Sequence, residues 1–121
     1  MGAGIMFISP NRKTLLIKRA DYKLDPYSGY WNMAGGGEEK GESDYETAVR
    51  ETREEIGEVN YQVFTHVETK MYTLFFAFVE EEFKPSLDHE HTDFKWVSID
   101  SLSSYKLHPK DYYCLRKVNL L

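Results

Sequence analysis

The chain has 121 residues, of which 41% are hydrophobic and 15% aromatic, and its formal net charge at pH 7 is −5. This length fits one domain, and the composition supplies a hydrophobic core, which excludes extensive disorder. The acidic balance argues against a protein that grips a polynucleotide backbone, because such proteins present a basic surface. The acidic balance does not exclude binding of small phosphorylated ligands, since a bound divalent cation inverts the local electrostatic field.

Cysteine content and hydropathy narrow the class further. Cys114 is the single cysteine, so an internal disulfide and a cysteine-based zinc site are excluded. No apolar run approaches the roughly 20 residues that cross a bilayer, and the N-terminus lacks the pattern of a signal peptide. We therefore expect a soluble, cytoplasmic protein that is either a monomer or a homodimer.

The predicted elements alternate between strands and helices along the chain. Apolar runs bounded by turn residues predict strands at residues 4–9, 14–19, 31–33, 61–69, 71–79 and 94–97. Polar stretches predict loops at residues 20–30 and 80–93. Helices are predicted at residues 44–56 and 109–118. The order indicates an α/β fold, with a mixed sheet and helices on its faces, in a single domain at residues 1–121.

The helix predicted at residues 44–56 has sequence signals at both ends. Ser43 and Glu46 have the spacing of a capping box, in which each side chain satisfies a free backbone amide of the first turn. Gly57 follows the last periodic residue, where a left-handed C-terminal cap favours glycine. The stripe expected to face the core consists of Tyr45, Ala48, Val49, Thr52 and Ile56.

Another side of this helix concentrates negative charge. At about 100° per residue, one sector of about 100° holds Glu51, Glu54, Glu55 and Glu58. Like charges spaced i,i+4 destabilise a helix, and a hard divalent cation such as Mg²⁺ or Mn²⁺ would remove that repulsion by taking the carboxylate oxygens. A solvated acidic face, partly offset by neighbouring arginines, explains the same pattern.

A glycine-rich segment precedes the helix. Gly35-Gly36-Gly37 and Gly41 let the backbone pass close to a phosphate or a metal without a side chain in the way. A backbone carbonyl from this turn could complete a magnesium shell that the carboxylates begin. An ordinary turn between strand and helix has the same composition, so the segment and the helix have to be considered together.

Together they resemble the Nudix box, in which a glycine is followed at fixed spacings by Glu, then Arg-Glu, then Glu-Glu and Gly. The box spans residues 36–58, and the residues that carry the resemblance are Gly36, Glu42, Arg50, Glu51, Thr52, Glu54, Glu55 and Gly57, which fill every charged position and both glycines of the pattern. The sequence departs from the pattern at Glu58, which is usually apolar, and at Ala34, where a proline is common. Neither departure touches a catalytic group.

The resemblance covers nearly the whole chain. Trp31 precedes the box at a familiar distance, Arg19 ends an early strand as in MutT-like members, and residues 96–100 look like the closing pattern of the family. The resemblance implies an α/β/α sandwich with a mixed sheet. It also implies an enzyme that cleaves a diphosphate linkage in a small nucleotide with Mg²⁺, for which Mn²⁺ can substitute.

The same resemblance implies roles for residues of the box. Glu54 and Glu55 correspond to the core metal ligands, and Glu51 is a further ligand or a base toward the attacking water. Glu54 is an alternative candidate for that base. The Gly35 carbonyl is an additional ligand. Arg50 corresponds to a position that braces the box by pairing with a carboxylate.

Outside the box, Glu90 is a second candidate base, because it precedes Trp96 by six residues as a loop glutamate does in MutT-like relatives. An exposed loop carboxylate is the alternative. The flanking His89 and His91 are interpreted as polar surface rather than as a metal site. Arg19 either meets a substrate phosphate through its guanidinium fork or is a strand-end charge in water.

The base of the nucleotide has two candidate contacts. Tyr30 and the other tyrosines of its loop could stack on it or pack on one another. Residues 109–111, which end in Asp111, look similar to the base-reading turn of nucleoside triphosphate sanitisers, and this favours a purine. The subclass that cleaves ADP-ribose usually has a proline soon after the box, whereas the first proline after the box here is Pro85.

The sequence therefore favours a (deoxy)nucleoside triphosphate as the substrate. Hydrolysis of an RNA 5′ end is an alternative that the acidic charge disfavours, and a dinucleotide or nucleotide sugar is another. A catalytically silent nucleotide-binding module is the alternative of a different class. Such modules tend to lose the box carboxylates, which this chain keeps.

Overall fold

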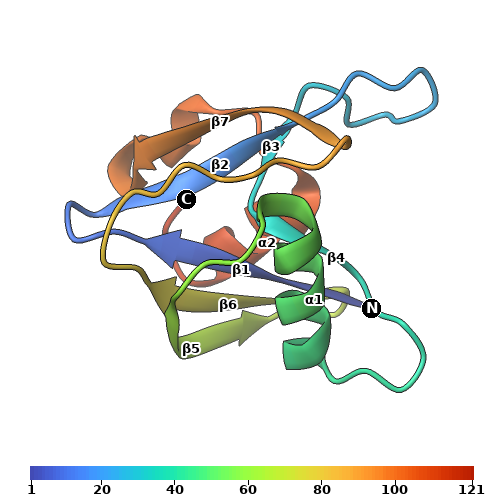
Figure 1. Ribbon diagram of the computed structural model, residues 1–121, viewed down its shortest axis with the longest axis horizontal. Helices are drawn as coiled ribbons and strands as arrows, with labels where there is room; N and C mark the ends of the chain where they lie inside the picture. Colours follow the sequence, from blue (N-terminus) through green and yellow to red (C-terminus); the bar gives the residue numbers. More distant parts are fainter.

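The computed structural model describes residues 1–121, and its strands form two sheets (Figure 1). The four-stranded sheet has the order β4-β1-β6-β5, formed by Ala34–Gly37, Gly2–Ile8, Tyr72–Phe78 and Gln62–Glu68. The three-stranded sheet has the order β3-β2-β7, formed by Trp31–Asn32, Lys13–Arg19 and His91–Ser98. Because β1 is parallel to β6 and antiparallel to β4, the larger sheet is mixed, as predicted.

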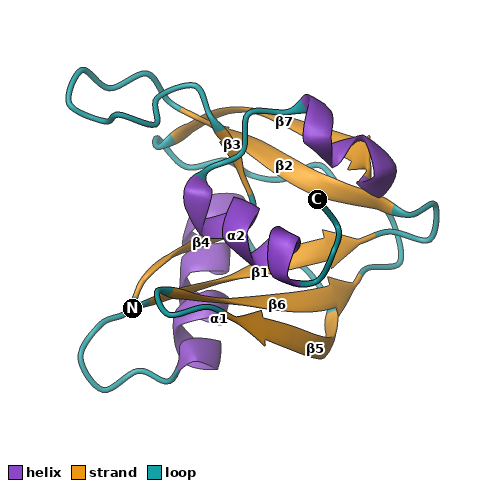
Figure 2. Ribbon diagram, turned by 180° about the vertical axis from the view of Figure 1, so that it is seen from behind, coloured by secondary structure: helices purple, strands orange, loops and turns teal.

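Two α-helices cover opposite faces of the mixed sheet (Figures 1 and 2). Helix α1 (Asp44–Ile56) packs against β1 and β4, and helix α2 (Pro109–Lys117) packs against β6. A 3₁₀ helix, η1 (Ile99–Ser104), follows β7. The predicted α/β fold with helices on the faces of a mixed sheet is confirmed. None of these helices has both the length and the apolar character needed to cross a lipid bilayer.

The central strand β1 divides the interior into two cores. Met6 belongs to the core under α2, where it is buried in one cluster with Leu115. Ile5 and Phe7 point to the other side and are buried in the cluster that contains Ile56 of α1. A strand covered on both faces requires a nearly continuous apolar run, which is the pattern by which β1 was predicted.

Helix α1 begins with the predicted capping box. Ser43 Oγ accepts the Glu46 N–H at 3.1 Å, and Glu46 Oε1 accepts the Ser43 N–H at 2.9 Å. The helix ends before Gly57, whose φ of 88° is positive but whose ψ of −173° is extended. The predicted left-handed cap is therefore wrong in its ψ, although this backbone conformation is also one that essentially only glycine adopts.

The buried face of α1 differs in part from the predicted stripe. Ala48 and Ile56 are buried as expected, but Tyr45 is exposed and its ring packs edge-on against Phe75 at 5.4 Å. Glu55 is buried instead, with 5% of its surface exposed. The neighbouring strand β4 is mostly glycine, so carboxylate side chains of α1 can pack directly against its backbone.

The region after β6 also departs from prediction. The predicted loop at residues 80–93 ends earlier, because β7 begins at His91 rather than at residue 94. Pairing with β2 lengthens the strand, since His91 lies opposite Arg19 at the end of the ladder. The 3₁₀ helix was not predicted, because six residues are too few to show a hydrophobic period.

The capping box should contribute measurably to stability. Replacing Ser43 by Ala removes the acceptor for the Glu46 N–H and should lower the free energy of unfolding by about 1 kcal/mol in urea titrations. Ser101→Ala changes an exposed serine of η1 and serves as the control. Equal midpoints for the two variants would contradict the capping assignment.

Candidate functional site

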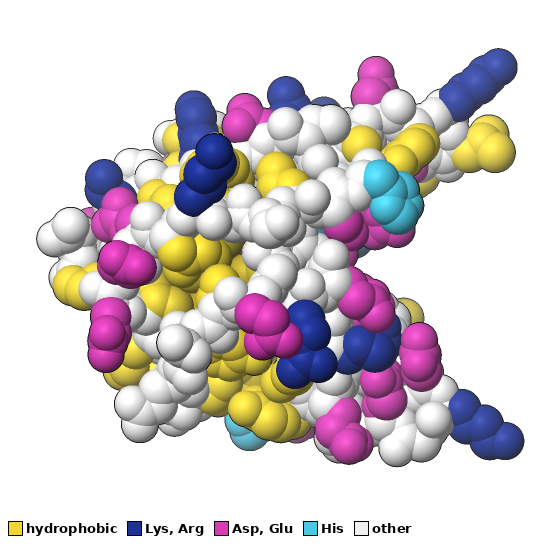
Figure 3. Space-filling view, in the orientation of Figure 1, with side chains coloured by type: hydrophobic (Ala, Val, Ile, Leu, Met, Phe, Trp, Pro, Cys, Tyr) yellow, Lys and Arg dark blue, Asp and Glu magenta, His cyan; other side chains and the backbone are white.

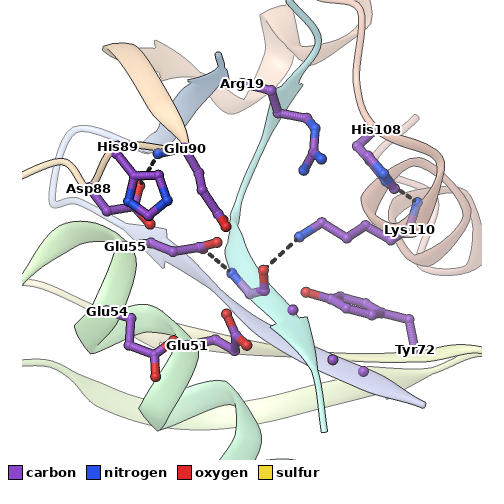
Figure 4. Close-up of a pocket in the computed structure, with 14 residues that line it drawn as sticks. Arg19, Glu51, Glu54, Glu55, Tyr72, Asp88, His89, Glu90, His108 and Lys110 are labelled. Atoms are coloured by element: carbon purple, nitrogen blue, oxygen red, sulfur yellow. Dashed lines mark hydrogen bonds between the residues drawn. The ribbon is translucent and has the colours of Figure 1, made fainter. Parts of the chain in front are cut away.

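A cavity of about 730 Å³ opens between strand β4, helix α1, the turn at residues 88–90 and the start of α2 (Figure 4). The molecular surface is hollowed here and acidic side chains gather around the opening (Figure 3). The acidic residues that line the cavity are Glu51, Glu54, Glu55, Asp88 and Glu90. Its cationic side chains are Arg19 and Lys110. Candidate residues from three separate parts of the sequence therefore line one cavity: the box carboxylates, Arg19 at the end of a strand and Glu90 in a loop.

Helix α1 presents three carboxylates to this cavity with increasing exposure. Glu55 is buried, and its Oε1 accepts a hydrogen bond from the backbone of β4 at 2.7 Å. Glu51 is half-buried, and Glu54 is exposed. Glu58 was expected on the same face but lies beyond the end of the helix, where it pairs with Arg53 at 2.7 Å. The acidic group of the cavity therefore excludes Glu58.

The glycines of β4 allow the backbone to approach these carboxylates. A Cβ atom added at Gly36 would stand 2.6 Å from the carboxyl carbon of Glu51. A Cβ atom at Gly35 would stand 2.6 Å from the Cα of Gly4 in the paired strand. Neither position has room for a side chain, so the glycines allow β4 to lie close to α1 and β1. The segment is a strand rather than a turn, and its approach to a phosphate or a metal stays a prediction.

Arg50 braces the carboxylates without lining the cavity. Its Nε donates to Glu42 at 2.7 Å, its Nη1 lies 3.1 Å from Glu51 and 3.2 Å from Glu54, and its Nη2 donates to the Gly37 carbonyl at 2.9 Å. The hydrogen bond from Arg50 is the main reason that the pKa of Glu42 falls to about 2. The same contacts raise the pKa of Arg50, so the guanidinium and its main partner stay charged.

The donor atoms on this wall fit a hard divalent cation. Burial raises the pKa of Glu55 to about 8 and also raises the pKa of Glu51. A nearby cation would reverse this effect, because it stabilises the ionised form. The available donors are carboxylate oxygens of Glu51, Glu54 and Glu55 and the Gly35 carbonyl, all of which belong to residues that line the cavity. Hard cations prefer such all-oxygen sets.

The turn that carries Glu90 is anchored to the end of α1. The Asp88 N–H donates to the Glu55 carbonyl at 3.2 Å, and Asp88 Oδ1 accepts the Glu90 N–H at 3.2 Å. The same carboxylate oxygen lies 2.8 Å from His91 Nδ1. His91 is buried, so its interpretation as polar surface was wrong. Ligand atoms of Glu55, Asp88 and His91 lie within 4.8 Å of one another, a grouping that could also hold a metal.

Cationic groups stand across the cavity from the carboxylates (Figure 4). The Arg19 guanidinium donates two hydrogen bonds to one carboxylate oxygen of Asp25, at 3.1 and 2.8 Å. Lys110 Nζ donates to the Gly35 carbonyl at 3.1 Å. Beside Lys110, burial lowers the pKa of His108 to about 4, so this ring is neutral at pH 7.

Two predicted substrate contacts lie outside the cavity. The Tyr30 ring packs against Tyr27 at 5.3 Å and lies under Lys106 Nζ at 4.5 Å. Asp111 is fully buried, and its Oδ2 accepts the Met33 N–H at 3.1 Å. Burial raises the pKa of Asp111 to about 6. In this conformation Asp111 fastens α2 to the link between β3 and β4.

The cavity also contains residues that were not selected from the sequence, namely Asp88, His108, Lys110 and Tyr72. The Tyr72 hydroxyl is buried and has no hydrogen-bond partner. Lys110 belongs to the segment at residues 109–111 that resembles a base-reading turn, and in this structure Lys110, rather than Asp111, lines the cavity. Asp88 and His108 carry no local signal, since such residues are common in loops and at helix starts.

The chain is similar throughout its length to proteins of one family. The family model described as the NUDIX domain matches residues 1–118. Nucleoside triphosphatase NudI of Escherichia coli is 30% identical to this chain over an alignment that covers 88% of each of the two chains. RenU, a Nudix hydrolase of M. smegmatis, is 23% identical with a TM-score of 0.77, over 98% of this chain and 84% of that one. A MutT structure from work on Aliivibrio salmonicida and Vibrio cholerae is 26% identical with a TM-score of 0.67, over 97% and 94%.

The neutral His108 ring makes stability depend on pH. Its Nδ1 accepts the Lys110 N–H at 3.1 Å and caps α2. Burial, with Lys110 and Arg19 nearby, lowers its pKa from 6.5 to about 4. The unfolded chain therefore takes up the proton first, and the stability contributed by the neutral ring, complete above pH 6.5, is lost as the pH falls through 4.

His108→Asn should make this acid-side loss shallower, because asparagine can cap the helix but does not titrate. Calorimetric melting temperatures measured between pH 4 and 7 for both proteins provide the comparison. Identical slopes would show that the ring does not carry the effect.

Proposed function

Because this chain belongs to the Nudix hydrolase family, whose enzymes cleave phosphorus-containing anhydrides, we propose that it hydrolyses the diphosphate linkage of a free (deoxy)nucleoside triphosphate with Mg²⁺. Water adds across the α–β anhydride, and the products are a nucleoside monophosphate and diphosphate. A free-nucleotide substrate implies a cytoplasmic enzyme. One chain supplies the whole cavity, which is compatible with a monomer or a homodimer.

The observation that carries this proposal is the division of the cavity into two walls of opposite charge (Figure 4). The acidic wall consists of Glu51, Glu54 and Glu55 from α1 with Asp88 and Glu90 from the adjacent turn. The opposite wall carries Arg19 and Lys110. A diphosphate with its divalent cation matches this division, because the cation can face the carboxylates while phosphate oxygens face the cationic groups.

Glu51, Glu54, Glu55 and the Gly35 carbonyl would hold the cation, Mg²⁺ or Mn²⁺ as its substitute. When bound, it would polarise the phosphoryl oxygens and make water at the site a better nucleophile near neutral pH. The chain itself supplies preorganisation. Arg50 orients Glu51 and Glu54 through its guanidinium, and the backbone of β4 orients Glu55. Such positioning avoids rearrangement during the reaction.

Glu51, Glu54 and Glu90 are the candidates for the base that takes a proton from the attacking water, and Glu54 is assigned here to the cation. Glu51 is half-buried on α1 and touches Arg50 at 3.1 Å, whereas Glu90 is exposed and its carboxylate has no protein hydrogen-bond partner. Glu90→Gln distinguishes them, because Glu51 is also a proposed metal ligand and Glu51→Gln would lower turnover in either role. The base variant should lose turnover while KM stays near its wild-type value, since the base acts in the transition state.

The substrate class is supported by relatives of known name. The NudI protein is named a nucleoside triphosphatase, and a MutT protein is similar over most of both chains. The cavity agrees with a highly charged ligand, because one hydrophobic side chain, Tyr72, is found among its lining residues. Arg19 is the proposed phosphate contact at the end of β2, where exchange of Asp25 for a phosphate would keep the guanidinium paired.

The reaction can be tested directly by product analysis. With Mg²⁺, the purified protein should convert at least one purine nucleoside triphosphate to monophosphate and diphosphate, which anion-exchange chromatography resolves. ADP-ribose and a short 5′-triphosphorylated RNA, supplied at equal concentration, are the competing substrates. Preferential cleavage of either competitor, or no cleavage of any nucleotide with Mg²⁺ or Mn²⁺, would overturn the proposal.

The roles of the box carboxylates predict a sharp contrast within one helix. Glu54→Gln and Glu55→Gln should each lower turnover on the order of 10²-fold or more, because each removes a charged oxygen donor from the cation. Glu58→Gln removes a carboxylate outside the cavity and should stay within about twofold of wild type. Mg²⁺ binding measured by calorimetry should weaken in the first two variants only. Wild-type turnover in both Glu54→Gln and Glu55→Gln would refute the assigned site.

A further inference from the structure

Lys110 stands in the cavity without a carboxylate partner, although acidic side chains line the same space (Figure 4). Its Nζ donates to two backbone carbonyls, those of Gly35 at 3.1 Å and Met33 at 3.4 Å. It also lies 5.2 Å from the centre of the Tyr72 ring. The other cation of the cavity, Arg19, is already paired with a carboxylate at 2.8 Å. Lys110 is thus the cation of this site that is free to meet an incoming anion.

The place of Lys110 in α2 does not favour a purely structural role. It is the second residue of the helix, after Pro109. A cation is unfavourable at a helix N-terminus, where the macrodipole is positive, and favourable in the last turn, where α2 has Arg116 and Lys117. The helix would gain from a neutral or acidic residue at this position. The charge of Lys110 therefore has to be explained by what it faces in the cavity.

The carbonyl that Lys110 holds is one of the oxygens that would ligate a divalent cation. An ammonium group and a divalent cation on the same carbonyl oxygen repel each other, and a partly buried site screens that repulsion less than water does. The four-carbon stem of lysine is flexible, so the ammonium can withdraw from Gly35. Phosphate oxygens are a suitable new partner, because a compact ammonium binds them as a point charge.

We propose that Lys110 couples metal binding to nucleotide binding by exchanging the Gly35 carbonyl for a substrate phosphate. Without ligands, Lys110 occupies this carbonyl and opposes entry of a divalent cation. When a nucleotide binds, its phosphate draws the ammonium away, and the carbonyl becomes available to the cation. Nucleotide and metal then strengthen each other's binding. The nucleotide half of this inference rests on the proposed function, whereas the metal half does not.

The first titration measures the metal alone. Mn²⁺ is added to the nucleotide-free chain, and the unbound ion is counted by electron paramagnetic resonance. Lys110→Met and Lys110→Gln should bind Mn²⁺ more tightly than wild type, by roughly fivefold or more. Lys106→Met is the matched control, because Lys106 is exposed and lies over Tyr30 outside the cavity; its affinity should not change. The glutamine variant can still donate to the carbonyl, so it maintains the test if the methionine variant does not fold.

The second titration measures the nucleotide. An α,β-methylene analogue of GTP, which resists cleavage, is titrated calorimetrically with Mg²⁺ present. Both neutral Lys110 variants should bind it more weakly, by roughly tenfold or more, and Lys110→Arg should recover most of the affinity. Opposite changes in the two titrations are the signature of the exchange, since a general loss of structure would weaken both.

Unchanged or weaker Mn²⁺ binding in the neutral variants would overturn the inference, as would unchanged affinity for the analogue. These outcomes are separate from failure of the proposed function. A wild-type protein that cleaves no nucleotide refutes that function, whereas the Mn²⁺ titration still decides whether Lys110 opposes the cation.

Discussion

The hydrogen bond from the Gly35 N–H to the Glu55 carboxylate, 2.7 Å long and buried, joins helix α1 to the glycine strand β4. A buried carboxylate is costly without such a partner, so the strand has to come close and turn its N–H inward. Glycine is required for that approach, because any side chain at Gly36 would collide with Glu51. The remaining box carboxylates share the helix with Glu55. Their positions at the cavity therefore depend on this one contact.

Two cationic side chains flank the carboxylates of α1, Arg50 on the solvent side and Lys110 inside the cavity. At the outer side, Arg50 links Glu42 to the carboxylates of α1, so repulsion along the helix is offset before any cation binds. At the inner side, Lys110 approaches from α2 and is the main charged group that opposes the rise in the pKa of Glu55. The cavity nevertheless contains more acidic than basic side chains. This excess of negative charge favours a divalent cation, and in the proposed function Arg19 and Lys110 would offset the negative charge of the nucleotide's phosphates.

The sequence predicts an element well where the residues that order it lie close together in the chain. The bounds of α1 agree with prediction because Ser43, Glu46 and the helical period act within one or two turns. Strand β7 was predicted too short, because its first residues are ordered by pairing with β2 rather than by their own composition. Residue chemistry makes Tyr30 and Asp111 candidates for substrate contacts, but chemistry alone does not say which way a side chain points. The packing of α2 turns Asp111 into the interior.

By itself the sequence determined the acidic face of α1, the glycines before it and the family to which the chain belongs, because these depend on residue types at fixed short spacings. Only the tertiary structure decided which carboxylate is buried, that His91 lies inside rather than at the surface, and that Lys110 reaches the carbonyl of Gly35, 75 residues away in the chain. Burial and Coulomb energy depend on distances between segments that only folding brings together. No spacing within one element encodes those distances.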